Sequence, residues 1–304
     1  MKIGVIVPQG WTGEYDGWDA AQAWARTRDV AGQAEALGFE SIWLFDHFHT
    51  VPRPTNEITF EAFTSLSALA AETRRVRLGH VVLCAAYRNA ALTAKMISTL
   101  DVISGGRAEL GIGAGWKRDE WLAYGYGFPE APARLAILRD HLEVARAMLD
   151  PDASARATYQ GEHAQVKDAI NIPRPVQQPS VPIMVGGNGR NVTWRLAARY
   201  ADELNLDNMA PDELREAWSV IESRCAEVDR DPSSLRVSVH IWWEQLGQAG
   251  QQRVELLSAY RELGVSRIIG LVRDSADSDE ALAALADDAR QAGAQMHDSH
   301  ALGA

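Results

Sequence analysis

An aspartate and a histidine stand side by side where an apolar run ends. Asp46 and His47 directly follow residues 41–45, a run typical of a buried strand. An imidazole can give or take a proton near neutral pH, so the pair is a candidate for acid–base chemistry. We treat both residues as candidate catalytic groups. The structural alternative is an aspartate that caps a loop and a histidine bonded to backbone.

Alternating glycines form a second candidate site. Gly111, Gly113 and Gly115 precede Trp116 at the end of another apolar run. Glycine lets a ligand approach the backbone closely, although a tightly packed interior would also require small residues. The GxGxG spacing is by itself a weak indication of a dinucleotide. Glu109, within the same run, is predicted to be a buried ion-pair member.

A further glycine cluster precedes a predicted helix. It consists of Gly186, Gly187, Asn188, Gly189 and Arg190. These residues would present unpaired backbone N–H groups, the positive end of a helix and a guanidinium to one point, which suits a phosphate. A plain turn from strand to helix needs one glycine, so we predict anion binding.

Tryptophan is abundant, with ten residues in 304. Four of them fall in predicted loops and could wall a flat, conjugated ligand. These four are Trp11, Trp18, Trp116 and Trp121. The other six lie in predicted helices or strands, where packing is expected: Trp24, Trp43, Trp194, Trp218, Trp242 and Trp243.

The remaining histidines that we consider are expected to have structural roles or none in catalysis. His240 is expected to be a satisfied core histidine, with a position facing the site as the alternative, and His141 is expected to be solvated. No histidine or cysteine has further ligands at metal spacing, so we predict no metal.

The elements that position these residues alternate between strands and helices. Short runs rich in Val and Ile predict eight strands, at 3–8, 41–45, 77–83, 107–113, 182–186, 202–206, 235–242 and 266–271. Amphipathic stretches predict eight helices, at 20–37, 60–73, 92–103, 132–149, 191–199, 211–228, 250–263 and 278–292.

Eight βα units predict an α/β fold, a single (β/α)8 TIM barrel that forms one domain over residues 1–304. Insertions are expected after strands 1 and 2 and before strand 5, at 9–19, 48–59 and 151–181. A doubly wound sheet is the main alternative, but no GxGxxG turn follows the first strand. In a barrel, the strand ends that carry Asp46, Gly113 and Gly186 would meet at one face.

Composition narrows the class of partner. The formal net charge is -11, which disfavours nucleic acid and anionic membranes as partners. Residues 73–100 and 169–201 nevertheless contain basic residues and no acidic ones, which leaves room for one small anion. The two cysteines lie far apart, and the first apolar run is too short for a signal peptide, so a cytoplasmic location is expected.

Four motifs in order resemble the bacterial luciferase-like superfamily, and within it the deazaflavin (coenzyme F420)-dependent oxidoreductases. They are residues 38–47, 73–79, 95–116 and 182–187, and the similarity extends over residues 1 to about 240. The resemblance implies coenzyme F420 as cofactor, with FMN as the alternative because FMN-dependent monooxygenases share this barrel.

The resemblance also assigns roles to individual residues. Asp46 and His47 match the pair that approaches the ring and the substrate, which makes His47 the candidate proton donor or substrate-orienting residue. Val81 and Val82 match a non-prolyl cis peptide behind the ring, and Cys84 matches a contact to the polar edge of the ring. The loop beside the ring matches Gly113, Ala114, Gly115 and Trp116. The phosphate loop matches Gly186, Gly187, Asn188, Gly189 and Arg190.

Two positions depart from the pattern. Trp116 replaces the catalytic Glu of the branch that oxidises sugar phosphates, which puts that substrate class in doubt. Ala90 replaces the usual Pro after Arg88 and Asn89.

The expected activity is hydride transfer between the deazaflavin C5 and a small organic substrate, by a homodimer such as is usual in the resembling family. The alternatives are an FMN-dependent monooxygenase that uses reduced flavin and oxygen, and a non-catalytic flavin-binding protein.

Overall fold

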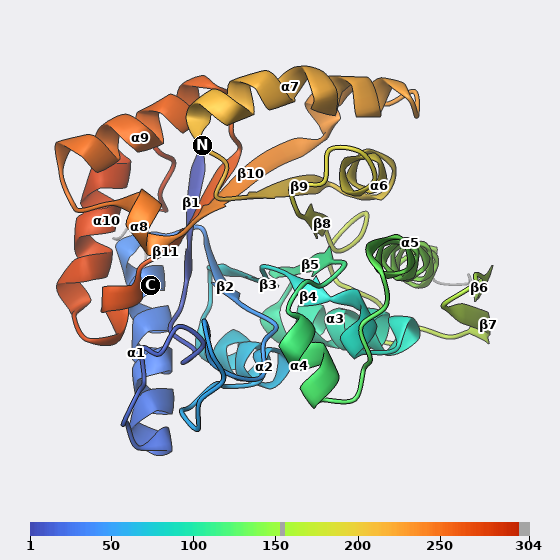
Figure 1. The fold of residues 1–304 in the computed structure, drawn as a ribbon, viewed down its shortest axis with the longest axis horizontal. Helices are drawn as coiled ribbons and strands as arrows, with labels where there is room; N and C mark the ends of the chain where they lie inside the picture. The colour runs from blue at the N-terminus through green and yellow to red at the C-terminus, as the bar shows by residue number, and fades with distance from the viewer. Residues whose placement is uncertain (153–155, 298–304) are drawn as a thin grey trace.

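A closed barrel of parallel strands forms the centre of the computed structural model, which describes residues 1–152 and 156–297 (Figure 1). Within these residues, eight strands follow one another around the barrel, and pairing of β3 with β5 closes it. The strands are β1 (Lys2–Ile6), β2 (Ser41–Leu44), β3 (Arg77–His80), β5 (Ala108–Gly113), β8 (Ile183–Gly186), β9 (Glu203–Asp207), β10 (Arg236–Ile241) and β11 (Arg267–Leu271). The predicted (β/α)8 barrel is confirmed.

Helices surround the barrel, one after each strand in the expected order. They are α1 (Ala20–Leu37), α2 (Ala62–Glu72), α3 (Ala90–Ser104), α5 (Ala131–Met148), α6 (Thr193–Tyr200), α7 (Pro211–Ala226), α9 (Gln251–Glu262) and α10 (Asp279–Gln291). Asp19 caps the start of α1, and Gly38 ends it in the left-handed conformation, at φ +90°. Ala90 is the first residue of α3, and the Asn89 side chain caps this helix, so its start is intact without proline.

Side chains along the strands alternate between two packing layers. Residues such as Val237, Val239 and Ile241 pack in the large apolar cluster between barrel and helices. The other set fills the barrel, where Trp43, Met184 and Ile269 belong to a separate cluster. Trp43 occupies the space left by Gly4 and Gly79. A Cβ at Gly79, for example, would lie 2.3 Å from the indole.

Short elements add to the predicted set. The expected strand 77–83 ends at His80, and the short strand β4 (Leu83–Cys84) pairs with β5. The excursion before β8 contains an antiparallel hairpin of β6 (Ala157–Gln160) and β7 (Gln165–Ala169), beside α5 at the periphery in Figure 1. The loops after β5 and β10 contain the short helices α4 (Arg118–Ala123) and α8 (Trp243–Leu246).

Across residues 1–152 and 156–297, no helix combines the length and apolar character needed to cross a membrane.

Candidate active site

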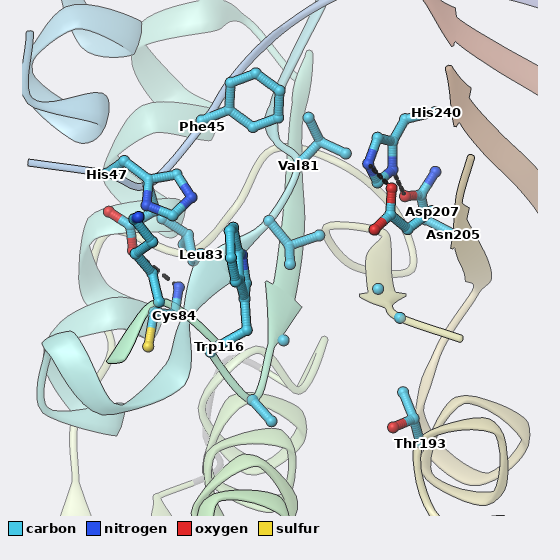
Figure 2. A pocket seen from close by; sticks show the side chains of 18 of the residues that line it. Phe45, His47, Val81, Leu83, Cys84, Trp116, Thr193, Asn205, Asp207 and His240 are labelled. Atoms are coloured by element: carbon cyan, nitrogen blue, oxygen red, sulfur yellow. Dashed lines mark hydrogen bonds and ion pairs between the residues drawn. The ribbon is translucent and has the colours of Figure 1, made fainter. Parts of the chain in front are cut away.

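A cavity of about 320 Å³ opens at the carboxyl ends of the barrel strands. It is lined by residues in or just after the carboxyl-terminal ends of β1, β2, β3, β5, β8, β9 and β10, so segments far apart in the sequence meet there (Figure 2). All of the residues to which the resemblance assigned a role, except Arg190, line this cavity. The strand ends therefore meet as the barrel prediction required.

His47 is held by a carboxylate that the sequence analysis missed. Its Nδ1 lies 2.7 Å from Oε2 of Glu120, whose side chain is fully buried. Glu120 also accepts hydrogen bonds from the Phe48 backbone N–H, at 2.6 Å, and from the Tyr87 hydroxyl, at 3.0 Å. With Nδ1–H donating to Glu120, the opposite ring nitrogen, Nε2, faces the cavity (Figure 2).

The charge of Glu120 is maintained by its partners. Burial raises the pKa of Glu120, but the hydrogen bond and the charge of His47 and the bond from the Phe48 N–H outweigh it, and the pKa lies below its ordinary value. Glu120 is thus an ionised acceptor that orients the His47 ring.

Aromatic rings enclose His47. The Trp11 ring stacks on the imidazole with 4.2 Å between ring centroids and 3° between planes, and Trp116 meets it edge-on at 5.9 Å. Trp11 is buried, whereas Trp116 is 62% exposed at the cavity mouth. Of the other loop tryptophans, Trp121 is buried in α4 beneath Gly115, and Trp18 packs on Tyr15 away from the cavity.

Asp46 forms an ion pair instead of presenting a free carboxylate. Its two oxygens each lie 2.8 Å from the Arg88 guanidinium, and one also accepts the Cys84 backbone N–H at 2.8 Å. These contacts tie the end of β2 to β4 and to the segment before α3. Asp46 therefore shapes the cavity wall, and a direct catalytic role for it stays a prediction.

Val81 and Val82 form the floor of the cavity, and the peptide bond between them is cis, as the resemblance implied. A Cβ at either Gly113 or Gly186 would lie 2.7 Å from a Val82 methyl group, so packing requires both glycines. Cys84 closes one edge, and burial raises the pKa of its thiol to about 12, which leaves a protonated group with no nucleophilic character at neutral pH.

The loop from Gly186 to Asn191 offers backbone donors. Within the described ranges, the N–H groups of residues 188–191 donate to no protein acceptor, whereas the Gly187 N–H is bonded to Asn205. Free N–H groups just before α6 suit a phosphate. The exposed Arg190 guanidinium lies over the Trp194 ring, 5.7 Å from its centroid, so its expected contact with an anion stays a prediction.

Three residues correct the predictions. His240 lines the cavity on the wall opposite His47 (Figure 2), because inward and outward side chains alternate along β10. Trp242, just after β10, lines the cavity beside Trp11 and Phe45. His141 is buried, and its ring nitrogens lie 2.9 and 3.0 Å from the carbonyl oxygens of Ile137 and Arg88.

Glu109 is confirmed as a buried ion-pair member, bonded to Arg267 and Arg77. Among the described residues, no group of three or more His, Cys, Asp or Glu side chains could hold a metal ion.

Known proteins resemble this chain in sequence and in fold. A family model described as luciferase-like monooxygenase matches residues 1–289. An F420-dependent glucose-6-phosphate dehydrogenase of Kineococcus radiotolerans is 38% identical over 178 residues, 57% of this chain and 50% of that protein. An uncharacterised protein of Mycobacterium tuberculosis is 28% identical over 82% of this chain and 88% of its own length.

The alignment with the F420-dependent glucose-6-phosphate dehydrogenase spans only half of that protein. Among solved structures, an F420-dependent secondary alcohol dehydrogenase in complex with an F420–acetone adduct superposes with a TM-score of 0.80. The match covers 96% of this chain and 98% of that chain at 20% identity, a likeness of fold.

Proposed function

The chain belongs to the luciferase-like monooxygenase family, and we propose that within it the protein is a coenzyme F420-dependent oxidoreductase. It would transfer hydride between the deazaflavin and a small organic substrate. The F420-dependent dehydrogenase among its relatives supports this choice of cofactor.

The residues present fit such a cofactor. The apolar floor of Val81 and Val82 and the small loop Gly113–Gly115 would accept a flat ring, and the free N–H groups of residues 188–191 would hold a phosphate. When bound, the deazaflavin supplies or accepts hydride at C5. We assign ring contacts to Val81, Val82, Cys84 and the loop 113–116, and phosphate contacts to the loop 186–190.

The chain's own contribution is a placed proton and a dry site. His47, with Nδ1 fixed by Glu120, holds or accepts a proton at Nε2 on the cavity side. Trp11 and Phe45 exclude water from one side of the His47 ring, because both are buried and lie next to it. The observation that carries the proposal is this buried His47–Glu120 pair in a cavity that also offers free N–H donors.

Spectroscopic titration tests the cofactor. Purified apoprotein is titrated separately with coenzyme F420 and with FMN, and we expect a saturable absorbance change with F420 at lower concentration. Tight FMN binding without a response to F420 would replace the proposal with the flavin-dependent monooxygenase, which the description of the family favours.

A screen of carbonyl, imine and activated alkene compounds against the reduced deazaflavin complex then tests turnover. We expect His47→Ala to bind F420 and to lose turnover by about 100-fold, the scale of one general acid. Unchanged turnover in this variant would contradict the role given to His47, and no turnover of any compound by the wild type would favour a non-catalytic flavin-binding protein.

We further propose that the protein works as a cytoplasmic homodimer. Leu92, Val102 and Ile103 are exposed on α3, and Ile103 lines a groove between α2 and α3. Their exposed apolar area suits a subunit contact. Sedimentation analysis should give twice the chain mass for the wild type and the chain mass for Ile103→Glu.

A further inference from the structure

A second polar group lies on the cavity wall opposite His47. Oδ1 of Asp207 lies 3.0 Å from His240 Nε2 and 2.9 Å from Trp242 Nε1. The other ring nitrogen of His240, Nδ1, is 2.8 Å from Asn205 Oδ1. The backbone of Asp207 is fixed as well, since it exchanges two hydrogen bonds with the Asn188 side chain.

This arrangement leaves an oxygen of Asp207 free. Within residues 1–152 and 156–297, no side chain or backbone group donates to Oδ2, and the Asp207 side chain is 50% exposed, against 13% for His240. Figure 2 shows His240 beside the carboxylate, with its ring nitrogens directed at Asp207 and Asn205. A ligand that enters the cavity from this side therefore meets an acceptor, because both nitrogens of His240 already face acceptors.

The carboxylate is ionised at neutral pH. Burial raises the pKa of Asp207, but the hydrogen bond and charge of His240 and the bond from Trp242 lower it further, so the pKa lies below its ordinary value. A fixed anionic oxygen is a strong acceptor for a charged donor and repels a phosphate or carboxylate.

Aromatic faces lie next to this oxygen. Trp242 stacks on Phe45 with 5.9 Å between centroids and 14° between planes, and it meets Trp11 at 5.6 Å. Indole faces attract cations as well as flat apolar groups. Asp46 pairs with Arg88 through both of its oxygens and Lys117 pairs with Asp119, whereas Asp207 keeps Oδ2 outside its pair with His240.

We propose that Asp207 is a specificity-determining residue, which selects substrates that carry a protonated amine or iminium nitrogen and disfavours anionic ones. This inference rests on the proposed function only in treating the occupant as the substrate. It adds to the departure at Trp116 a second reason, on the opposite wall, against a sugar phosphate as substrate.

Three probes of similar shape and different charge test the selectivity: benzylammonium, benzyl alcohol and benzoate. Their binding to the F420-loaded protein at pH 7 is measured by tryptophan fluorescence and calorimetry. We expect benzylammonium to bind at least about tenfold more tightly than benzoate, the scale of one charge-assisted hydrogen bond. Equal affinities, or tighter binding of benzoate, would overturn the proposal without any variant.

Asp207→Asn assigns the selectivity to the residue. The variant should bind benzylammonium about tenfold more weakly and benzyl alcohol within about twofold of the wild type. Asp212→Asn, at an exposed position on α7, is the matched control and should change neither value. If Asp207→Asn kept the wild-type preference among the three probes but bound F420 more weakly, the free oxygen would be a contact to the cofactor. That outcome would overturn the proposal.

Failure of the proposed function is distinguishable from failure of this inference. The same ranking is measured in the apoprotein, so a chain that does not bind F420 still reports whether its cavity prefers benzylammonium. A chain that binds F420 and shows no preference refutes only the role of Asp207.

Discussion

The chemistry available to the cavity depends on which nitrogen of His47 carries a hydrogen. Glu120 accepts at Nδ1, so Nε2 is the position left for a substrate. The Tyr87 hydroxyl and the Phe48 N–H also donate to the Glu120 carboxylate, which holds it in place. We infer that Glu120 is a positioning residue that acts through His47.

Glu120→Gln tests this assignment. The amide keeps the shape but offers His47 a choice between an oxygen and an N–H, so the Nδ1–H tautomer loses its preference. We expect ¹⁵N NMR of the His47 ring to show that loss, and turnover to fall by about 100-fold with F420 affinity within about twofold. Glu216→Gln, exposed on α7, is the control. Unchanged ring resonances in Glu120→Gln would contradict the assignment.

His80 is a residue whose burial has a cost at low pH. Its side chain is fully buried beside Phe63, and burial lowers its pKa to about 4 despite the nearby charge of Asp46. The unfolded chain takes up this proton near pH 6.5, whereas the folded chain does not until about pH 4. Protonation in this window therefore favours unfolding.

We expect the free energy of unfolding to fall as pH decreases from 6.5 to 4, with up to about 3 kcal/mol of the loss due to His80. His80→Leu should remove that part, so the gap between wild type and variant should change across this window and stay constant above pH 7. Urea denaturation at several pH values measures it, with exposed His297→Gln as the control. Parallel curves for wild type and His80→Leu would refute the prediction.

At the scale of elements, the period of two along the strands decides which residues reach the cavity. In β9, Leu204 and Leu206 pack in the outer cluster, and Asn205 and Asp207 line the cavity. The sequence of β10 has the same alternation, so its polar positions could have been assigned to the barrel interior. His240 occupies such a position: it lines the cavity, which was the alternative for it, although both of its ring nitrogens are bonded as the main expectation required.

Other features had no such signal. The six residues of α4 are too few for a helical period, and Glu120 meets His47 from 73 positions away, so nothing local pairs them. The hairpin β6–β7 falls between Pro151 and Pro173, in a segment whose prolines favour irregular structure. By contrast, α1 was predicted with its observed bounds, because Asp19 and Gly38 mark both ends.

The connection from α2 to β3 depends on a buried arginine of the next unit. Arg107, just before β5, donates to the carbonyl oxygens of Ala70, Thr73 and Val76 at 2.8–3.0 Å. Arg107→Met would leave these acceptors without partners, and we expect a loss of about 2–4 kcal/mol in the free energy of unfolding. Urea denaturation measures it. The exposed substitution Arg215→Met on α7 should change stability by at most about 0.5 kcal/mol, and an equal loss in both would contradict the prediction.

At the scale of the whole molecule, the two ends of the barrel have different tasks. The cavity lies at the carboxyl ends of the strands, whereas a buried network of charged side chains fills the opposite end. Arg267 is buried there and bonds to Glu40, Glu109 and Glu203, which come from three different sides of the barrel. The charges of Arg267 and Arg77 outweigh burial and lower the pKa of Glu109 to about 2.

Removal of the Arg267 charge from this network is expected to reduce the free energy of unfolding by an amount that grows with pH. In the wild type, Glu109 has a folded pKa below its unfolded value, so its contribution is present above about pH 4.5 and is lost as pH falls toward 2. Arg267→Met leaves three buried carboxylates without their shared cation. The pKa values of Glu40 and Glu109 should then rise above the unfolded value, and that of Glu203, which burial already raises, should rise further, so that ionisation opposes folding.

We therefore expect Arg267→Met to lose at least about 3–5 kcal/mol at pH 8 and clearly less at pH 5, where the carboxyls can take up protons. Urea denaturation at both pH values measures the difference. Arg107→Met is the matched control, because the hydrogen-bond acceptors of Arg107 are carbonyl and hydroxyl oxygens that do not titrate, and its penalty should change little with pH. If the two variants showed the same dependence on pH, the closed end of the barrel would not depend on the charge of Arg267.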